Sequence, residues 1–186
     1  MHRPAALCAL SLILAGCASV SERLVDATVA WRTEEVSALL AKGGNPDAKD
    51  AEGKTLLMLA ANSGNPELVK TLAEHKADVN ARAQNGATAL LMAVANSKNV
   101  PVVKLLLEHK ADANAKLPGG ITALMTAVSA EGKPEIVKLL LAHGADVNAR
   151  TEKGTTAYKV AVNSNRADLA KLLLKAGARA ERPSAP

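Results

Sequence analysis

The chain has 186 residues, of which 48% are hydrophobic, and it carries 23 Lys and Arg against 18 Asp and Glu. With one Trp, one Tyr and no Phe, it has almost no aromatic platforms on which nucleic-acid bases could stack. The excess of positive charge is small and Lys alternates with Glu along the chain, so we expect no nucleic-acid partner.

The first 17 residues form a leader with a short basic start and an apolar run over 5–15. That run is too short for a stable transmembrane helix but suits the apolar part of a secretory signal. It closes with Leu14-Ala15-Gly16-Cys17, which resembles a bacterial lipobox. We therefore expect residues 1–16 to be a lipoprotein signal peptide and Cys17 to be lipidated. The alternative is that Cys17 is an incidental cysteine of the leader.

Residues 17–21 are expected to be the lipidated cysteine and a short tether, so the folded part would begin close to a membrane. Ala18 stands where lipoproteins kept in the inner membrane typically carry Asp, and by that resemblance we expect the periplasmic face of the outer membrane. The choice of membrane and leaflet stays open. Cys17 would be the last cysteine after cleavage, so the folded part would hold no disulfide.

The stretch 22–49 contains two short helical patterns joined at Trp31. It is a degenerate copy of the segments that follow, as the first unit of a repeat array usually is. Trp31 suits three roles: a partner contact, an anchor at a membrane interface, or a cover for the exposed end of the array. The last of these is the commonest for such a residue.

From residue 50 onward the sequence repeats with a period of 33 or 34 residues. Two columns recur in phase, a threonine at Thr55, Thr88, Thr122 and Thr156 and an alanine at Ala60, Ala93, Ala127 and Ala161. A fixed period of this length predicts a solenoid in which each unit packs only on its neighbours. The expected units span approximately 22–49, 50–82, 83–116, 117–150 and 151–180, with a disordered tail at 181–186.

The repeat unit resembles the ankyrin repeat family. Thr122-Ala-Leu-Met-Thr-Ala stands where that family has T-P-L-H-x-A, and the stretch from Glu135 to Asn148 follows its second helix and turn. The resemblance covers roughly residues 22–180. It implies an all-α solenoid of about five helix pairs with β-hairpin fingers, and a protein-binding module without enzymatic activity.

Two departures from the family pattern concern rigidity rather than fold. The family histidine is replaced by Met58, Leu91, Met125 and Lys159, so the usual Thr–His hydrogen bonds are not expected. The glycine that ends the second helix is replaced by Lys76 and Lys110 in the middle units. If these lysines adopt a left-handed conformation, glycine at either position should stabilise the fold.

Three repeated side-chain patterns could suggest other chemistry. Histidines recur at His75, His109 and His143, but stacked helices lie about 8–10 Å apart, so these side chains should not share one metal ion. The Asp-x-Asn pairs have turn chemistry. No nucleophile–base pattern or phosphate loop is present, so we expect no catalytic site and no cofactor.

A column of lysines on the second helices, Lys70, Lys104, Lys138 and Lys171, forms an outer stripe that is either a solvated face or a second binding surface. The preferred binding surface is the concave one, made by finger tips and first-helix ends. The partner-binding residues predicted there are Arg82, Gln84, Asn85, Lys116, Leu117, Arg150, Glu152, Lys153, Asn62, Asn96 and Ser129.

Taken together, these features predict a monomeric, lipid-anchored protein of the bacterial envelope that binds another envelope protein. With arginines but few aromatics available, the interface should be polar and salt-sensitive. One use is a scaffold or chaperone for an envelope enzyme. The alternative is an immunity-type inhibitor of a toxin delivered to the periplasm, and the sequence does not decide between them.

Overall fold

The computed structural model describes residues 19–96, 99–129 and 134–180. The expected signal peptide, Cys17, the start of the tether and the tail at 181–186 lie outside these ranges. Within them the chain forms ten α-helices and no regular strand. None of the described helices is long and apolar enough to cross a membrane.

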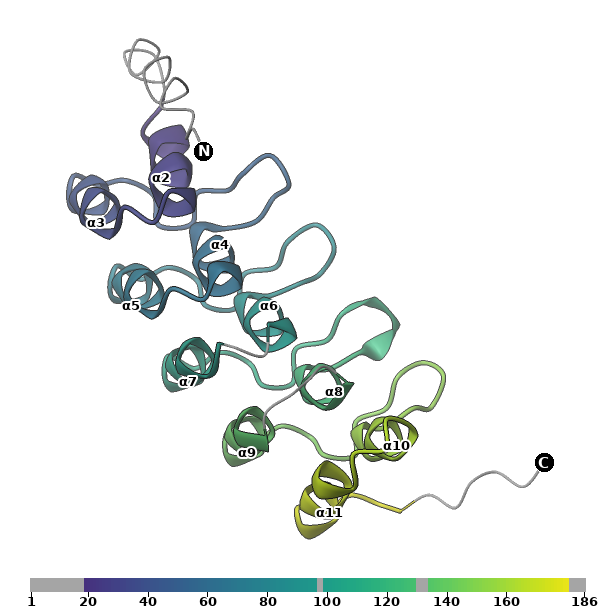
Figure 1. Cartoon of the computed structure of the whole chain (residues 1–186). Helices are drawn as coiled ribbons and strands as arrows, with labels where there is room; N and C mark the ends of the chain where they lie inside the picture. Colours follow the sequence, from purple (N-terminus) through teal and green to yellow (C-terminus); the bar gives the residue numbers. More distant parts are fainter. Residues whose placement is uncertain (1–18, 97–98, 130–133, 181–186) are drawn as a thin grey trace, which may run out of the picture.

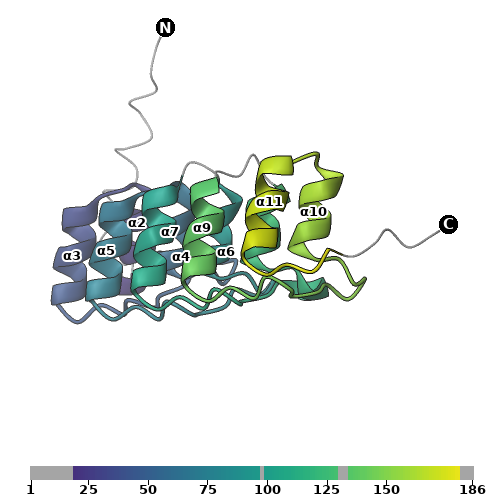
Figure 2. The same ribbon diagram turned by 90° about the horizontal axis from the view of Figure 1, so that it is seen from below.

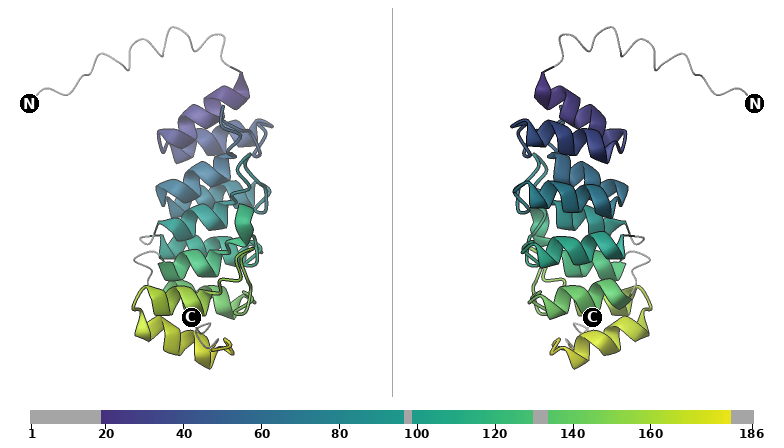
Figure 3. Two further views of the ribbon diagram at one scale, coloured as in Figure 1. Left: turned by 90° about the vertical axis from the view of Figure 1, so that its right-hand side faces the viewer. Right: turned by 90° about the vertical axis from the view of Figure 1, so that its left-hand side faces the viewer.

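The helices form five antiparallel pairs that stack into two rows (Figure 1). The inner row, from which the loops project, contains α2, α4, α6, α8 and α10; the outer row contains α3, α5, α7, α9 and α11. The described termini lie at opposite ends of the stack (Figure 3). The all-α repeat solenoid expected from the sequence is therefore confirmed. The pairs are α2 (Val20–Val29) with α3 (Thr33–Ala41), α4 (Leu56–Ser63) with α5 (Pro66–Glu74), α6 (Ala89–Ala95) with α7 (Val100–Glu108), α8 (Ala123–Ser129) with α9 (Pro134–Ala142), and α10 (Ala157–Asn163) with α11 (Ala167–Lys175).

The threonine column explains why the inner helices begin where they do. Each buried threonine is an N-cap whose Oγ1 accepts a hydrogen bond of 3.3 Å from the backbone N–H three residues later, as Thr55 does from Met58. Outer helix α5 begins at Asn65-Pro66-Glu67: Asn65 Oδ1 accepts from Leu68 N–H at 3.1 Å, and Pro66 occupies the first turn. Side-chain capping therefore fixes the start of several helices in register.

The outer helices end in a residue with positive φ. Gly144 and Gly177 have φ of 81° and 93°, and Lys76 and Lys110 at the corresponding positions both have φ of 65°. Both lysines therefore adopt the left-handed conformation on which the predicted stabilisation by glycine depends. A residue with a Cβ pays a conformational penalty there that glycine does not.

The core is a continuous strip of Leu, Val and Ala side chains between the two rows. Leu57, Leu90 and Leu124, one from each of three successive inner helices, are each 1% exposed. Small alanines alternate with them, which lets neighbouring units approach closely. Thr28 of α2 is an exception: it is 1% exposed and its Oγ1 has no hydrogen-bond partner among the described residues.

The Asp-x-Asn pairs join each unit to the next. Asp112 Oδ1 accepts from the N–H of Asn114 at 2.8 Å, which is the expected local turn. Asn114 reaches into the following unit, where its Nδ2 donates to Gly144 O at 2.9 Å and its Oδ1 accepts from Asp146 N–H at 2.7 Å. The same pattern recurs at Asn80 and Asn148. This second role is not among those predicted from the sequence.

Between the helix pairs the chain makes four short loops, here called fingers, at 49–55, 82–88, 116–122 and 150–156 (Figure 2). In the third finger, Leu117 N–H donates to Ile121 O at 2.9 Å, and equivalent bonds close the others. Among the described residues only two isolated antiparallel bridges occur, Lys49 to Thr55 and Lys116 to Thr122. The hairpins expected from the family are therefore tight turns without regular strands, because each is too short for a ladder.

The two ends of the described stack differ in polarity. At the N-terminal end, Glu35 occupies the position where later units have a buried apolar residue such as Leu68, and it forms ion pairs with Arg32 at 2.7 Å and Arg23 at 3.7 Å. At the C-terminal end, interior-type positions are open: Val162 is 53% exposed, whereas Val128 at the equivalent position is 0% exposed. Leu174 nearby is also 42% exposed.

Candidate protein-binding surface

The fingers lie side by side and are cross-linked by hydrogen bonds. Arg82 Nη1 donates to Gly86 O of its own finger at 3.2 Å and to Lys116 O of the next finger at 3.0 Å. Glu152 N–H donates to Gly119 O at 3.0 Å, which joins the third finger to the fourth. These contacts fix the spacing of the fingers before any partner binds.

Glycine is required where the last two fingers approach most closely. Gly120 has φ of 79°, and a Cβ added there would lie 3.1 Å from Thr151 Cα and 3.2 Å from Arg150 O. Both neighbours are backbone atoms, so they cannot rotate away. The fourth finger therefore packs directly against the third, and side chains project from both.

All eleven residues predicted to bind a partner are exposed or half-exposed in the structure. Eight of them lie in the fingers: Arg82, Gln84, Asn85, Lys116, Leu117, Arg150, Glu152 and Lys153. The other three lie toward the far ends of inner helices: Asn62, Asn96 and Ser129. Together they define what is called here the finger surface.

Several of these side chains also hold the finger surface together. Arg150 Nη1 donates to Gly154 O at 3.4 Å, and Asn85 Oδ1 accepts from Ala87 N–H at 3.1 Å. Asn96 Nδ2 lies 3.5 Å from Asn62 O of the preceding inner helix, α4. Leu117 is half-buried and packs against the core. Their exposed atoms are thus presented by side chains with defined positions.

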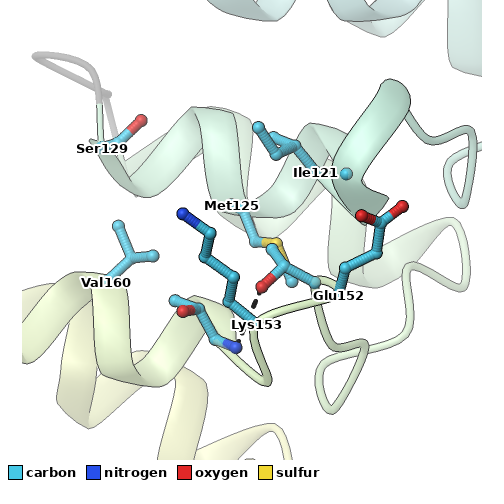
Figure 4. A pocket seen from close by; sticks show the side chains of 9 residues that line it. Ile121, Met125, Ser129, Glu152, Lys153 and Val160 are labelled. Atoms are coloured by element: carbon cyan, nitrogen blue, oxygen red, sulfur yellow. Dashed lines mark hydrogen bonds between the residues drawn. The ribbon is translucent and has the colours of Figure 1, made fainter.

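The finger surface is hollowed between α8 and the fourth finger (Figure 4). This pocket has a volume of about 410 Å³. Met125, which is 3% exposed, lies at its floor, and Ile121, which is 41% exposed, lies at its edge. Sequence reasoning placed Ser129, Glu152 and Lys153 on the surface but did not identify the pocket. Its lining residues are Gly119, Ile121, Met125, Ser129, Thr151, Glu152, Lys153, Thr155 and Val160.

Charge on the fingers is mainly positive toward the C-terminal end. The first finger holds Glu52 in a hydrogen-bonded ion pair with Lys54, and this bond raises the pKa of the Lys54 amine. The third and fourth fingers together carry Lys116, Arg150 and Lys153 against Glu152, a net charge of 3 − 1 = +2. The C-terminal half of the surface therefore attracts acidic groups.

The outer lysine stripe is partly paired with acids of its own helices. Lys70 lies 3.9 Å from Glu74 and Lys104 lies 3.8 Å from Glu108, each one helical turn later. Exposed pairs of this kind contribute little to stability but reduce the net charge of the face. Lys171 of α11 borders a shallow pocket that lies between α10 and α11 at the C-terminal end of the described stack.

Trp31 lies on neither the finger surface nor the outer stripe. It occupies the connector between α2 and α3 with φ of 58°, and its side chain is 60% exposed. It borders a shallow pocket with Ser63 to Glu67, the connector of the second unit. It therefore lies beside its neighbouring connector, on the side of the stack away from the fingers, rather than across the free end.

The repeated histidines make local helix contacts. His75 Nδ1 lies 2.9 Å from Thr71 O, and His143 Nδ1 lies 2.9 Å from Leu139 O, each one turn earlier. Among the described residues no three His, Cys, Asp or Glu side chains come together as metal ligands. His75 and His143 thus make the same contact at equivalent positions of their helices.

A family model for ankyrin repeats in three copies matches residues 27–117 and again 91–183. The chain belongs to the ankyrin repeat family. Ankyrin repeats are protein interaction modules, which fits a preorganised surface better than a reaction centre. No curated protein matches this ankyrin repeat chain at the significance required.

Proposed function

We propose that this ankyrin repeat protein is a lipid-anchored binding module of the bacterial envelope whose finger surface binds another envelope protein. The observation that supports the binding surface most directly is the cross-linking of the fingers, above all by Arg82, which joins its own finger to Lys116 O of the next. A surface that is already rigid loses less conformational entropy on binding than a set of mobile loops would. We further propose that one copy acts alone, as a scaffold or chaperone for its partner.

The proposed interface is polar. The finger surface offers arginines, lysines and amides but no Trp or Tyr, the residues that most often dominate binding energy. Rim charges of this kind act mainly on the rate of association and are screened by salt. Affinity should therefore fall as the ionic strength rises from low to physiological values.

The partner is best sought with the intact lipoprotein solubilised from envelopes in detergent, followed by quantitative mass spectrometry of the captured proteins. The test variant is Lys116→Glu with Lys153→Glu. Arg82 and Arg150 are left unchanged because their side chains also bind finger carbonyls, so their loss would alter the structure of the fingers as well as the contact with the partner. The matched control is Lys104→Glu with Lys138→Glu on the outer helices. A protein lost only in the finger variant is the proposed partner.

Two other results would contradict this assignment. Loss of a protein only in the outer-helix variant would place the binding site on the lysine stripe. If both variants capture the same proteins as the wild type, binding through the charged finger surface is wrong. The identity of a captured protein, an envelope enzyme or a delivered toxin, would separate the scaffold from the immunity role.

The anchor is tested separately, by metabolic labelling with an alkyne fatty acid. Label should be incorporated by the wild type and by Cys8→Ala but not by Cys17→Ala, because only Cys17 follows the lipobox residues. Detergent-free fractionation should then release the Cys17→Ala protein from the membrane pellet. Label that persists in Cys17→Ala would show that the proposed anchor is wrong.

A further inference from the structure

The pocket beside α8 differs from the rest of the finger surface in one residue. Ile121 lies at the junction between a finger and its inner helix, where the other fingers have Lys54, Ala87 and Thr155. A large apolar side chain that is 41% exposed is therefore specific to this unit. With Met125 below it and Val160 of α10 opposite, Ile121 makes an apolar hollow in a surface that is otherwise mainly polar (Figure 4).

The hollow is formed in the free chain. Its walls come from two neighbouring units, and the hydrogen bond of 3.0 Å from Glu152 N–H to Gly119 O joins them. Thr151 Oγ1 accepts a further bond of 3.0 Å from Thr155 N–H, which closes the fourth finger beneath it. Because the first bond holds the two walls together and the second closes the fourth finger, little rearrangement is needed before a side chain can enter.

The charges around the hollow determine which partner residues can flank a side chain that enters it. Lys153 and Glu152 point toward opposite ends of the pocket (Figure 4), and Lys116 and Arg150 belong to the same two fingers. The positive excess on these fingers attracts carboxylates and repels basic residues. At about 410 Å³ the volume is near the lower end of ligand pockets, which suits one aliphatic side chain and its neighbours.

We infer that this pocket receives a leucine-sized aliphatic side chain from an acidic segment of the protein partner, with the flanking carboxylates bound by the lysines and arginine of the third and fourth fingers. The inference rests on the proposed protein-binding function and names the chemistry of the segment that binds. The aliphatic side chain supplies hydrophobic contact and the carboxylates supply orientation.

The isoleucines of the chain provide a direct probe. The full sequence has three, Ile13, Ile121 and Ile136, and Ile136 is fully buried in α9. The lipoprotein in detergent, labelled only at the δ1 methyl of isoleucine, should give one NMR signal from each isoleucine that follows the signal peptide, which leaves Ile121 and Ile136. The variant Ile121→Val assigns them. Ile121 then reports on the pocket and Ile136 serves as an internal control.

The probes are short synthetic peptides with a central Leu between Glu and Asp residues. The acidic Leu peptide should shift the Ile121 signal and leave Ile136 unchanged. A peptide with Ser in place of Leu should bind about tenfold more weakly, because the apolar contact is lost. A peptide with Lys in place of the acids should bind more weakly again, and Ile121→Thr, which copies the last finger, should remove the preference for Leu over Ser.

The inference is wrong if the Leu and Ser peptides bind equally, if Ile121 does not shift at saturation, or if no acidic peptide binds at concentrations up to about 1 mM. It fails separately from the proposed function. If an envelope partner needs Lys116 and Lys153 but still binds the Ile121→Thr variant, the proposed finger surface is supported and the proposed role of the pocket is wrong. If the acidic Leu peptide shifts the Ile121 signal but no envelope protein is captured, the proposed role of the pocket is supported and the proposed envelope partner is wrong.

Discussion

The Oδ1 of Asn80 accepts a hydrogen bond of 2.8 Å from the backbone N–H of Asp112, which lies 32 residues further along the chain. The same amide donates to Lys110 O at 3.2 Å, so one side chain satisfies two backbone groups of the next unit. This contact repeats through the stack and is a direct polar link between successive units.

Replacing Asn114 by Asp should weaken that link. The carboxylate still accepts from Asp146 N–H, but it has no donor for Gly144 O, which now faces another oxygen. We expect a loss of about 1–2 kcal/mol in the free energy of unfolding, measured by urea denaturation followed by circular dichroism. An unchanged unfolding midpoint would mean that solvent satisfies the carbonyl equally well.

The first unit allows the reverse substitution, from aspartate to asparagine. Asp47 occupies the position of the bridging asparagine and accepts from Asp78 N–H at 2.7 Å, but its carboxylate has no N–H to offer Lys76 O. Asp47→Asn should therefore raise stability by about 0.5–1 kcal/mol in the same assay. Opposite signs for Asn114→Asp and Asp47→Asn would establish the donor as the source of the effect.

Glycine in place of either left-handed lysine should stabilise the protein. Lys76→Gly and Lys110→Gly each remove the strain of a Cβ at φ of 65°, for a gain of about 1 kcal/mol. Gly144→Lys is the matched control and should cost a similar amount, since a Cβ there meets nothing within 4 Å and only the backbone conformation is penalised. If both lysine variants melt earlier than wild type, the interpretation fails.

The buried hydroxyl of Thr28 should be dispensable. Valine has nearly the same shape, and the equivalent positions hold Ala61, Val94 and Val128. Thr28→Val removes an unpaired polar atom from the core and should raise stability by about 1 kcal/mol, measured by the shift of the thermal unfolding midpoint. Thr88→Val is the contrast, because it removes an N-cap and should lower stability by about 1 kcal/mol.

Two valines at equivalent positions should respond differently to truncation. Val128 is covered by the next unit, so Val128→Ala should cost about 1–3 kcal/mol through a buried cavity. Val162 is more than half exposed at the end of the described stack, and Val162→Ala should cost less than about 0.5 kcal/mol. Similar losses at both would indicate that something covers Val162 in solution.

The sequence was sufficient to predict the register of the stack because Thr55, Thr88, Thr122 and Thr156 recur at a fixed period and cap helices locally. The same comparison of columns identified Lys76 and Lys110 as replacements of the family glycine, and the structure then gave their conformation. These features depend on residues within one unit, and each unit can be compared with four others.

The inter-unit asparagines and the pocket could not be read from the sequence in the same way. Asn80 and Asp78 look like two parts of one turn, and the partner of Asn80 becomes visible only when the next unit is placed beside it. Nothing in the neighbourhood of Ile121 along the chain shows that it borders a hollow. Its exposure depends on the distance between α8 and the fourth finger, which is a property of packing.

The contrast between the two ends of the described stack bears on how such an array can change in length. Glu35 and its ion pairs close the N-terminal side, so a duplicated unit inserted before α2 would bury charge. Val162 and Leu174 expose an apolar face of the kind that is buried between units elsewhere in the stack. A duplicate of 151–180 placed after them could therefore pack on this face as 151–180 packs on the unit before it. Gene duplication can therefore lengthen this protein from one side at much lower cost than from the other.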